Sequence, residues 1–366
     1  MSLIDFLLVI FGLILLIAGG ESLVRGASTL AAKAGVTPLV IGLVVVSAAT
    51  SAPEFAVTMG AVLDGEPGLA VGNVVGSNIV NILLILGLSA IILPLLIQRQ
   101  VVRFDIPVMV FLSVAVLLLS LDGSISRIDG ALLFAGVVFH AVQSIRVSRK
   151  NNGSKISNDT PAFNAKPINL RIALLLLISG IALLTLGARL LVSGAVNIAT
   201  ALGVSGLIVG LTVVAVGTSL PELVTSIVAI KRGERDMAVG NIVGSNIFNI
   251  GFVLGLPAIL VSKGIPVPEA AVSFDFPIMI AAAIALLPIT FTGFAIARWE
   301  GGLFVLIYAA YLTFLVLDAT GHDAATGFST IMLWFAIPLI AITLIAFTAY
   351  EVGLNKGRKQ ASEAKL

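Results

Sequence analysis

The feature that most constrains this chain is an internal repeat. Residues 42–87 align without gaps with residues 210–255, and 24 of the 46 aligned positions are identical. The first copy contains T-S-A-P-E-F, starting at Thr50, and the second contains T-S-L-P-E-L, starting at Thr218. Both copies then contain G-N-x-V-G-S-N-I-x-N. Self-similarity of this kind predicts a fold assembled from two related units.

The amino-acid composition indicates that these two units lie in a membrane rather than in water. The chain has 366 residues, 58% of them hydrophobic and 11% charged, with a mean hydropathy of +1.14. A globular domain is about a quarter charged, so this apolar surface requires a lipid bilayer. There is no cysteine, which excludes disulfides and thiolate sites, and the net charge of +2 gives no nucleic-acid-binding face.

About 20 apolar residues cross a bilayer, and the apolar runs predict an all-α membrane protein with about eleven transmembrane helices. The predicted spans are 3–24, 37–63, 68–97, 104–121, 127–147, 170–192, 204–230, 236–262, 273–293, 299–317 and 329–350. They divide the chain into a first five-helix repeat (1–147), a polar cytoplasmic linker (148–169), a second five-helix repeat (170–317), and an extra helix with a cytoplasmic tail (318–366).

Five spans separate equivalent points of the two copies, so the second copy is predicted to lie upside down relative to the first, as in many secondary transporters. Basic residues set the orientation. With the N-terminus outside and the C-terminus in the cytoplasm, 18 of the 21 lysines and arginines fall inside, and Arg127, Arg189 and Lys263 remain outside. This distribution follows the positive-inside rule. We expect a multi-pass protein of the cell (inner) membrane.

Each copy places a glutamate after a proline in a long apolar run, Glu54 in one and Glu222 in the other. An ionised carboxylate in hydrocarbon costs at least about 2.5–3.5 kcal/mol, so two at matched positions need a compensating partner. A structural pair of protonated acids is the alternative. Matched, mirrored positions favour a bound cation, and two carboxylates balance one divalent ion or two sodium ions.

The surrounding residue types suit a hard cation. Each proline frees backbone carbonyls in the preceding turn, within Ser47 to Thr50 and Ala215 to Thr218. Carbonyl, hydroxyl and carboxylate oxygens favour calcium, magnesium or sodium over zinc or copper. The neighbouring helix of each copy carries Asn, Ser and Asn at intervals of four residues: Asn73, Ser77 and Asn81, and Asn241, Ser245 and Asn249.

Other polar and small residues in the motifs favour structural roles. Asn78 and Asn246 lie about 100° around the helix from the serines, which predicts structural hydrogen bonds rather than ligation. Gly72, Gly76, Gly240 and Gly244 have the small-xxx-small spacing of closely packed helices. Asp275 lies near the end of a predicted span and is expected to be solvated.

The paired motifs resemble the alpha repeats of the calcium/cation antiporter superfamily, specifically those of prokaryotic sodium/calcium exchangers. The resemblance implies ten core helices, one calcium site flanked by sodium sites, no cofactor and no enzymatic activity. Access would alternate as helices 1 and 6 slide against the rest. By resemblance, Glu54, Glu222 and the Thr50 and Thr218 carbonyls would ligate calcium. The sodium sites would use the Ser47 and Ala215 carbonyls and the side chains of Ser51, Ser77, Ser219 and Ser245. Asn81 and Asn249 would occupy the middle.

This chain departs from the pattern of that superfamily in two motif positions. Many relatives have an aspartate in place of Asn249, and Ala49 stands where glycine is usual. We expect a monomer that exports calcium in exchange for sodium. A proton/calcium exchanger and a potassium-dependent sodium/calcium exchanger are the alternatives within this class. From other classes, a passive channel remains open, whereas an intramembrane serine hydrolase would lack a histidine or lysine base near Ser51 or Ser219.

Overall fold

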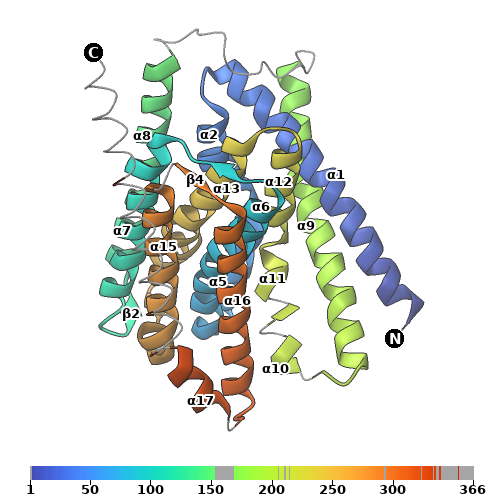
Figure 1. Cartoon of the computed structure of the whole chain (residues 1–366), viewed down its shortest axis with the longest axis vertical. Coiled ribbons are helices and arrows are strands. Elements are labelled where there is room, and N and C mark those ends of the chain that lie inside the picture. Colours follow the sequence, from blue (N-terminus) through green and yellow to red (C-terminus); the bar gives the residue numbers. More distant parts are fainter. Residues whose placement is uncertain are drawn as a thin grey trace.

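The computed structural model describes residues 2–152, 169–204, 206–209, 212–213, 215–291, 294–322 and 324–332, together with the single residues 334, 338 and 353. Within these ranges the protein is a bundle of helices with two very short strand pairs (Figure 1). By length and apolar composition, seven described helices can cross a membrane, or eight if one bent pair is a single span. A multi-pass membrane protein, as the sequence predicts, is therefore confirmed.

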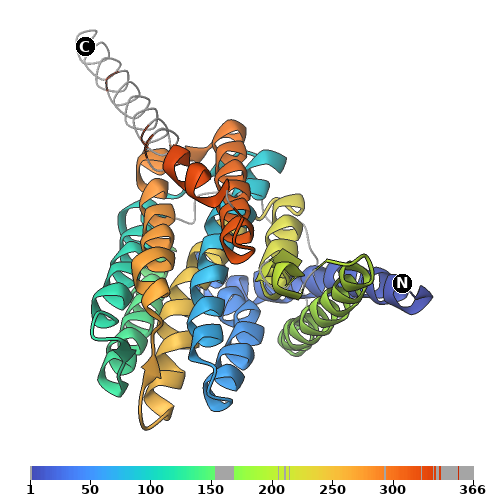
Figure 2. The same ribbon diagram turned by 90° about the horizontal axis from the view of Figure 1, so that it is seen from below.

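Two long helices form a pair set apart from the rest of the bundle, as Figure 2 shows from below. They are α1 (Leu3–Ala34) and α9 (Leu170–Ala201), the first helix of each half. Their glycines allow backbone contact: a β-carbon at Gly12 would lie 2.6 Å from the Leu191 nitrogen, and one at Gly26 would lie 2.7 Å from the Ala173 oxygen. Because contacts move toward the start of α9 as α1 advances, the two helices are antiparallel.

The second helix of each half is broken in the middle. In the first half it consists of α2 (Pro38–Ile41), the π-helical η1 (Gly42–Val46), α3 (Ser47–Thr50) and α4 (Ala52–Leu63), with a bend of 42° before α4. In the second half the described pieces are α10 (Gly206–Val209), α11 (Ala215–Thr218) and α12 (Leu220–Lys231). Pro53 and Pro221 stand in the first turns of α4 and α12, where a missing N–H costs nothing.

The third helix of each half lies in the centre of the bundle and contains a wide π-helical segment. The first half has α5 (Pro67–Ile79), η2 (Val80–Leu86) and α6 (Gly87–Ile92). The second has α13 (Arg235–Phe248), η5 (Asn249–Leu254) and α14 (Gly255–Leu260). Single π turns are rare and often mark functional sites. Here they begin next to Asn81 in one half and at Asn249 in the other.

The outer helices cover this centre. They are η3 (Val101–Asp105), α7 (Ile106–Leu119) and α8 (Arg127–Asn152) in the first half, and η6 (Ala271–Asp275), α15 (Phe276–Phe291) and α16 (Arg298–Ala319) in the second. Short α17 (Ala324–Ile331) follows. The buried core is mainly aliphatic: Leu16, Leu23, Val74 and Ile242 are 0–1% exposed, and the aromatic ring of Phe304 is fully buried beside such residues.

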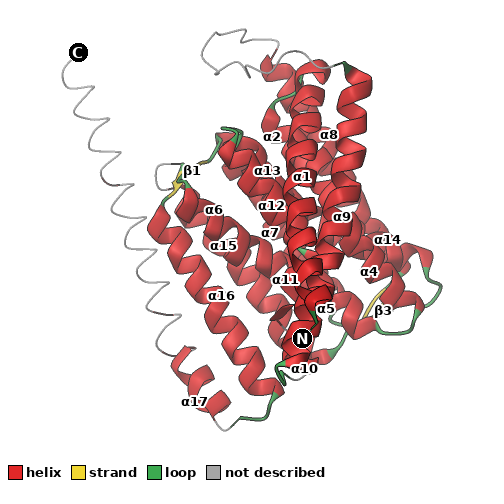
Figure 3. Ribbon diagram, turned by 90° about the vertical axis from the view of Figure 1, so that its right-hand side faces the viewer, coloured by secondary structure: helices red, strands yellow, loops and turns green. Residues whose placement is uncertain are grey.

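Two antiparallel strand pairs, which the sequence did not predict, connect the halves. β1 (Leu95–Leu96) pairs with β4 (Ala295–Ile296), and β2 (Ser124–Ile125) pairs with β3 (Ile265–Pro266). Figure 3 shows β1 and β3 as short strands in separate parts of the bundle. Each pair takes one strand from each half.

The described helices match ten of the eleven predicted spans in position, with different ends. α1 and α9 continue ten and nine residues beyond the predicted ends at 24 and 192, and the later turns of each helix pack on the first turns of the other. α8 runs to Asn152, into the segment predicted as a linker. The seventh span, 204–230, is described in pieces, and residues 205, 210–211 and 214 lie outside the described residues. Most of the predicted eleventh helix, 329–350, and residues 153–168 of the linker lie outside the described residues.

Candidate functional site

The candidate site is built around the two breaks. Glu54 and Glu222 lie in the first turns of α4 and α12, directly after the turns at Ser51 and Ser219. Both carboxylate side chains are 0% exposed. The first turn of a helix has free N–H groups and favours negative charge, which helps to place an acid at these points.

No described residue forms a hydrogen bond with either carboxylate. All four carboxylate oxygens, two on Glu54 and two on Glu222, are buried and lack a hydrogen-bond partner within the described part of the chain. The two groups are close enough for their charges to repel, and the hydroxyls of Thr50 and Ser245 lie beside Glu222. Buried acids without partners are costly, so these oxygens are arranged to be satisfied by something other than the protein.

Other oxygens in the same region are also left without hydrogen bonds. Among the described residues, the hydroxyls of Ser51, Ser77, Ser219 and Thr225 and the side-chain oxygens of Asn81 and Asn249 are buried and unpartnered. Thr225 is the member that sequence reasoning missed. It lies three residues after Glu222 on α12 and has valine as its counterpart in the first copy, so the repeat did not mark it.

Asn73 and Asn241 form hydrogen bonds with the backbone carbonyls of the two glutamates. The Asn73 amide donates to the Glu54 carbonyl (3.1 Å) and to the Thr58 hydroxyl (3.0 Å). The Asn241 amide makes the equivalent contact with the Glu222 carbonyl (3.4 Å) and with a hydroxyl of the same helix. Each asparagine thus holds the third helix of its half against the helix that carries the glutamate.

Thr50 joins the halves. Its hydroxyl donates to the Asn241 side-chain oxygen (3.2 Å) and lies 3.4 Å from the Ser245 hydroxyl. The Ser47 carbonyl already accepts the Ser51 N–H at 2.9 Å, while the Ser47 hydroxyl donates to the Leu43 carbonyl. The Thr50 hydroxyl also lies 3.4 Å from the Ser47 carbonyl oxygen, which therefore has two close donors in this conformation. Ala215 and Thr218 are the first and last residues of α11.

Asn78 and Asn246 make the structural hydrogen bonds predicted for them. The Asn81 amide donates to the Asn246 side-chain oxygen, and the Asn249 amide donates to the Asn78 side-chain oxygen, both at 3.1 Å. Each bond therefore crosses from one half to the other, and all four side chains are at most 1% exposed.

The glycine prediction is confirmed in one half and wrong in the other. A β-carbon at Gly240 would lie 2.5 Å from the Leu39 oxygen, and one at Gly244 would lie 2.4 Å from the Leu43 oxygen, so α13 packs directly on the α2–η1 backbone. At Gly72 and Gly76 no described atom lies within 4 Å of such a carbon. Gly72 is exposed, and this side of α5 is open where the matching side of α13 is closed.

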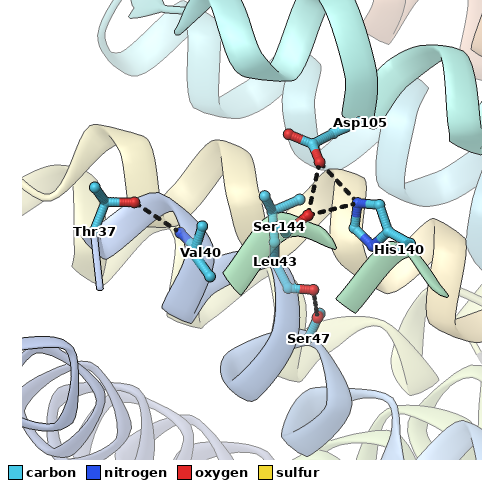
Figure 4. Close-up of polar contacts among 7 residues, drawn as sticks. All are labelled: Thr37, Val40, Leu43, Ser47, Asp105, His140 and Ser144. Atoms are coloured by element: carbon cyan, nitrogen blue, oxygen red, sulfur yellow. Dashed lines mark hydrogen bonds and ion pairs between the residues drawn. The ribbon is translucent and has the colours of Figure 1, made fainter. Parts of the chain in front are cut away.

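A second polar cluster, which the sequence analysis did not identify, lies between η3 and α8. Figure 4 shows the His140 ring and the Ser144 hydroxyl both directed at one oxygen of Asp105, at 2.8 and 3.2 Å. All three side chains are 0% exposed. In the second half, Asp275 takes the equivalent place and accepts a longer contact (3.5 Å) from Tyr311. Asp275 is half-buried, so the prediction that it is solvated is wrong.

The two aspartates, but not their partners, carried a sequence signal. F-D-x-P-x-M occurs at Phe104 to Met109 and again at Phe274 to Met279, at an offset of 170 rather than 168. The partner residues differ in type, histidine in one half and tyrosine in the other, so an identity search at the first offset passes over them.

The fold and the site together are those of a multi-pass membrane transporter for cations: broken helices place two carboxylates, without hydrogen-bond partners among the described residues, and a set of neutral oxygens inside an apolar bundle. Comparison with known proteins agrees. The family described as "Sodium/calcium exchanger protein" matches residues 4–143 and 172–317. The chain belongs to this sodium/calcium exchanger family, within the calcium/cation antiporter superfamily.

Individual relatives cover most of the chain. The putative antiporter CaxA of Alkalimonas amylolytica is 38% identical over 78% of this chain and 89% of its own length. The inner membrane protein YrbG of Escherichia coli (strain K12) is 37% identical over 85% and 95%, and the sodium/calcium exchanger MaX1 of Methanosarcina acetivorans is 32% identical over 86% and 99%.

A solved structure shows the same fold. The sodium-calcium exchanger NCX_Mj, soaked with 2.5 mM Na+ and 0.1 mM Ca2+, superposes with a TM-score of 0.72 at 31% identity. The match covers 86% of this chain and 99% of that chain. These relatives are transporters rather than enzymes, and transporters of this family use no cofactor; the ions are cargo.

Proposed function

We propose that this protein exports calcium across the inner membrane in exchange for sodium, with both ions using the site between Glu54 and Glu222. One observation carries the proposal: four buried carboxylate oxygens have no hydrogen-bond partner within the described chain. A single calcium ion or two sodium ions would neutralise the two charges equally. A site that one ion type must leave before the other can enter is a basis for exchange.

The proposed ligands are the residues implied by the family resemblance. Calcium would take oxygens from Glu54, Glu222 and the Thr50 and Thr218 carbonyls. The Ser47 and Ala215 carbonyls would form the sodium sites with the hydroxyls of Ser51, Ser77, Ser219 and Ser245, and Asn81 and Asn249 would complete the middle. Support comes from the unpartnered oxygens on Ser51, Ser77, Ser219, Asn81 and Asn249.

The architecture proposed for this function is a pair of inverted five-helix repeats, 1–147 and 170–317, with an additional C-terminal helix. The antiparallel packing of α1 on α9 supports the inversion, since these are the equivalent first helices. The reciprocal strand pairs support it too, because β1 and β3 occupy matching places in the two halves. The excess of basic residues on one side supports an outside N-terminus and a cytoplasmic C-terminus.

In an alternating-access cycle, the face of α5 that carries Gly72 would become packed against a neighbouring helix. The matching face of α13, which carries Gly240, would lose its packing. Gly72 and Gly240 are equivalent residues, one exposed and one in backbone contact. An inverted pair of halves in which only one side is packed is the arrangement that such a cycle requires. The α1–α9 pair, which lies at one side of the bundle and packs on α12, would be the sliding element (Figure 2).

Calcium uptake by proteoliposomes tests the proposal. Purified protein is reconstituted with sodium inside, and calcium entry is measured against sodium, potassium and proton gradients in turn. We expect uptake with an outward sodium gradient and none with a proton gradient alone. Uptake driven by pH but not by sodium would establish a proton/calcium exchanger, and uptake without any counter-ion would establish a channel. A requirement for potassium together with sodium would show potassium-dependent exchange.

A further inference from the structure

The four asparagines at the centre are joined to two methionines in a reciprocal network. The Asn78 amide donates to the Met279 sulfur (3.4 Å) and to the Asn246 carbonyl, while the Asn78 oxygen accepts from Asn249. In the other direction, the Asn246 amide donates to the Met109 sulfur (3.5 Å), and its oxygen accepts from Asn81. Met109 and Met279 are themselves equivalent, each in an F-D-x-P-x-M segment.

The chemistry of these contacts fixes which way every amide points. A thioether sulfur has no proton and can only accept, so the methionine must face the NH2 end of Asn78 or Asn246. The oxygen of that asparagine is then turned to the opposite side, where it accepts the NH2 of Asn249 or Asn81. The orientation of an amide is ordinarily an ambiguous choice, but here each one follows from its neighbour.

The consequence appears at the far end of each chain of contacts. Asn81 and Asn249 donate their NH2 groups to the side-chain oxygens of Asn246 and Asn78. Their own side-chain oxygens are therefore directed away from these two asparagines. Both oxygens are buried and unpartnered among the described residues. A cation needs oxygen and is repelled by an amide NH2, so the same side chains rotated by half a turn would oppose ion binding.

We propose that Asn78 and Asn246 are positioning residues, each of which locks the amide of the opposite half so that Asn249 or Asn81 presents oxygen to the transported cation. The proposal rests on the proposed function, since it assigns these oxygens to an ion site. Neither Asn78 nor Asn246 would touch the ion. A carboxylate presents an oxygen to the ion in either orientation, but an asparagine does so in only one. The lock explains how a neutral asparagine can act as an ion ligand at this position.

A double-mutant cycle tests the lock. Asn78→Leu removes the acceptor that holds Asn249, and we expect the half-saturating concentrations of calcium and sodium to rise about tenfold, with the maximal rate changed by less than about twofold. In the Asn249→Asp background the side chain has two oxygens and needs no lock. There, Asn78→Leu should change both concentrations by less than about twofold.

Three outcomes would overturn the lock: unchanged half-saturating concentrations in Asn78→Leu, a fall in maximal rate alone, or equal losses in both backgrounds. Ser113→Ala is the matched control. The Ser113 hydroxyl is buried one turn from Met109, and among the hydrogen bonds described it donates to the Met109 backbone carbonyl of its own helix rather than to an asparagine. It should leave both concentrations unchanged.

A milder variant covers the case in which Asn78→Leu does not fold. Met279→Leu conserves volume and removes the sulfur acceptor, so of the two acceptors described only the 3.4 Å contact with the Asn246 carbonyl still orients the Asn78 amide. We expect a smaller increase, about threefold, in the same concentrations; no change would contradict the network.

The test also separates the lock from the proposed exchange. Calcium-induced thermal stabilisation of the purified protein is measured beside the flux. If the unsubstituted protein is stabilised by calcium but shows no sodium-driven uptake, the proposed exchange fails, and the lock is then judged by the concentration of calcium needed for stabilisation.

Discussion

Gly240 lies against the backbone of Leu39, so that a β-carbon at residue 240 would stand 2.5 Å from the Leu39 carbonyl oxygen. At its equivalent in the other half, Gly72, no described atom lies within 4 Å of the position of that carbon. The two halves therefore differ in packing at positions that are identical in sequence.

This difference gives a prediction about conformational bias. Gly240→Ala should destabilise the observed conformation by about 1–3 kcal/mol, because overpacking forces the helices apart. Gly72→Ala should leave stability nearly unchanged. It should instead slow exchange, since residue 72 would meet a backbone in the opposite state of an inverted cycle. Thermal unfolding and proteoliposome flux measure the two effects. Equal behaviour of the two variants would argue against the inverted cycle.

The second prediction concerns the two glutamates. Glu54→Gln or Glu222→Gln keeps the side-chain shape and removes one charge, so calcium exchange should be abolished while the protein still inserts and purifies normally. Glu66→Gln, on the exposed turn before α5, is the matched control and should retain full activity. Normal exchange in either glutamate variant would remove that carboxylate from the mechanism.

The third prediction concerns the Asp105–His140 pair. His140→Leu leaves a fully buried carboxylate facing only a serine among the contacts described, and breaking a buried pair costs about 3–5 kcal/mol. We expect a clearly lower midpoint of thermal unfolding in detergent. Tyr311→Phe, at the equivalent place in the second half, removes a longer contact to a half-buried acid and should cost about 1 kcal/mol or less. A larger loss in Tyr311→Phe than in His140→Leu would contradict this ranking.

The fourth prediction concerns the α1–α9 pair. A β-carbon at Gly19 would lie 2.7 Å from the Leu184 nitrogen, so Gly19→Val cannot be accommodated without separating the two helices. We expect a lower unfolding midpoint and reduced exchange. Gly302→Val, on α16, is the control, since no described atom lies within 4 Å of a β-carbon there. It should be tolerated.

Much of this fold was predictable because the repeat and the apolar runs report directly on local structure. The prolines at 53 and 221, which were expected to free carbonyls in the preceding turns, lie two residues after the points where the two helices are interrupted. The angular offset of Asn78 from Ser77 predicted its structural hydrogen bonds. The features that could not be predicted, such as where a helix ends, depend on contacts between segments that are distant in the sequence. Helical periodicity cannot show that α1 continues to Ala34, since those last turns are fixed by their neighbours.

The residues of the candidate site were named from the sequence and their role as ion ligands stays a prediction, whereas the surroundings of these residues could not be predicted. The sequence cannot show that Gly72 is exposed while Gly240 is packed, because a conformational state is not a property of the repeat. It also gave no reason to join Asp105 to His140, which are 35 residues apart and have no identical counterpart pair. That contact exists because η3 and α8 pack together.

The cross-half contacts have a consequence for how the protein is made. β1 cannot pair until β4, which lies about 200 residues later in the chain, has been synthesised. In the same way, Asn81 cannot form its hydrogen bond until Asn246 has been synthesised. While the ribosome is still producing the second half, the Asn81 amide in the inserted first half lacks its Asn246 partner, and hydrocarbon cannot supply another one. Biogenesis of this protein therefore requires the early helices to remain sheltered, by the insertion machinery or by one another, until the last helices arrive.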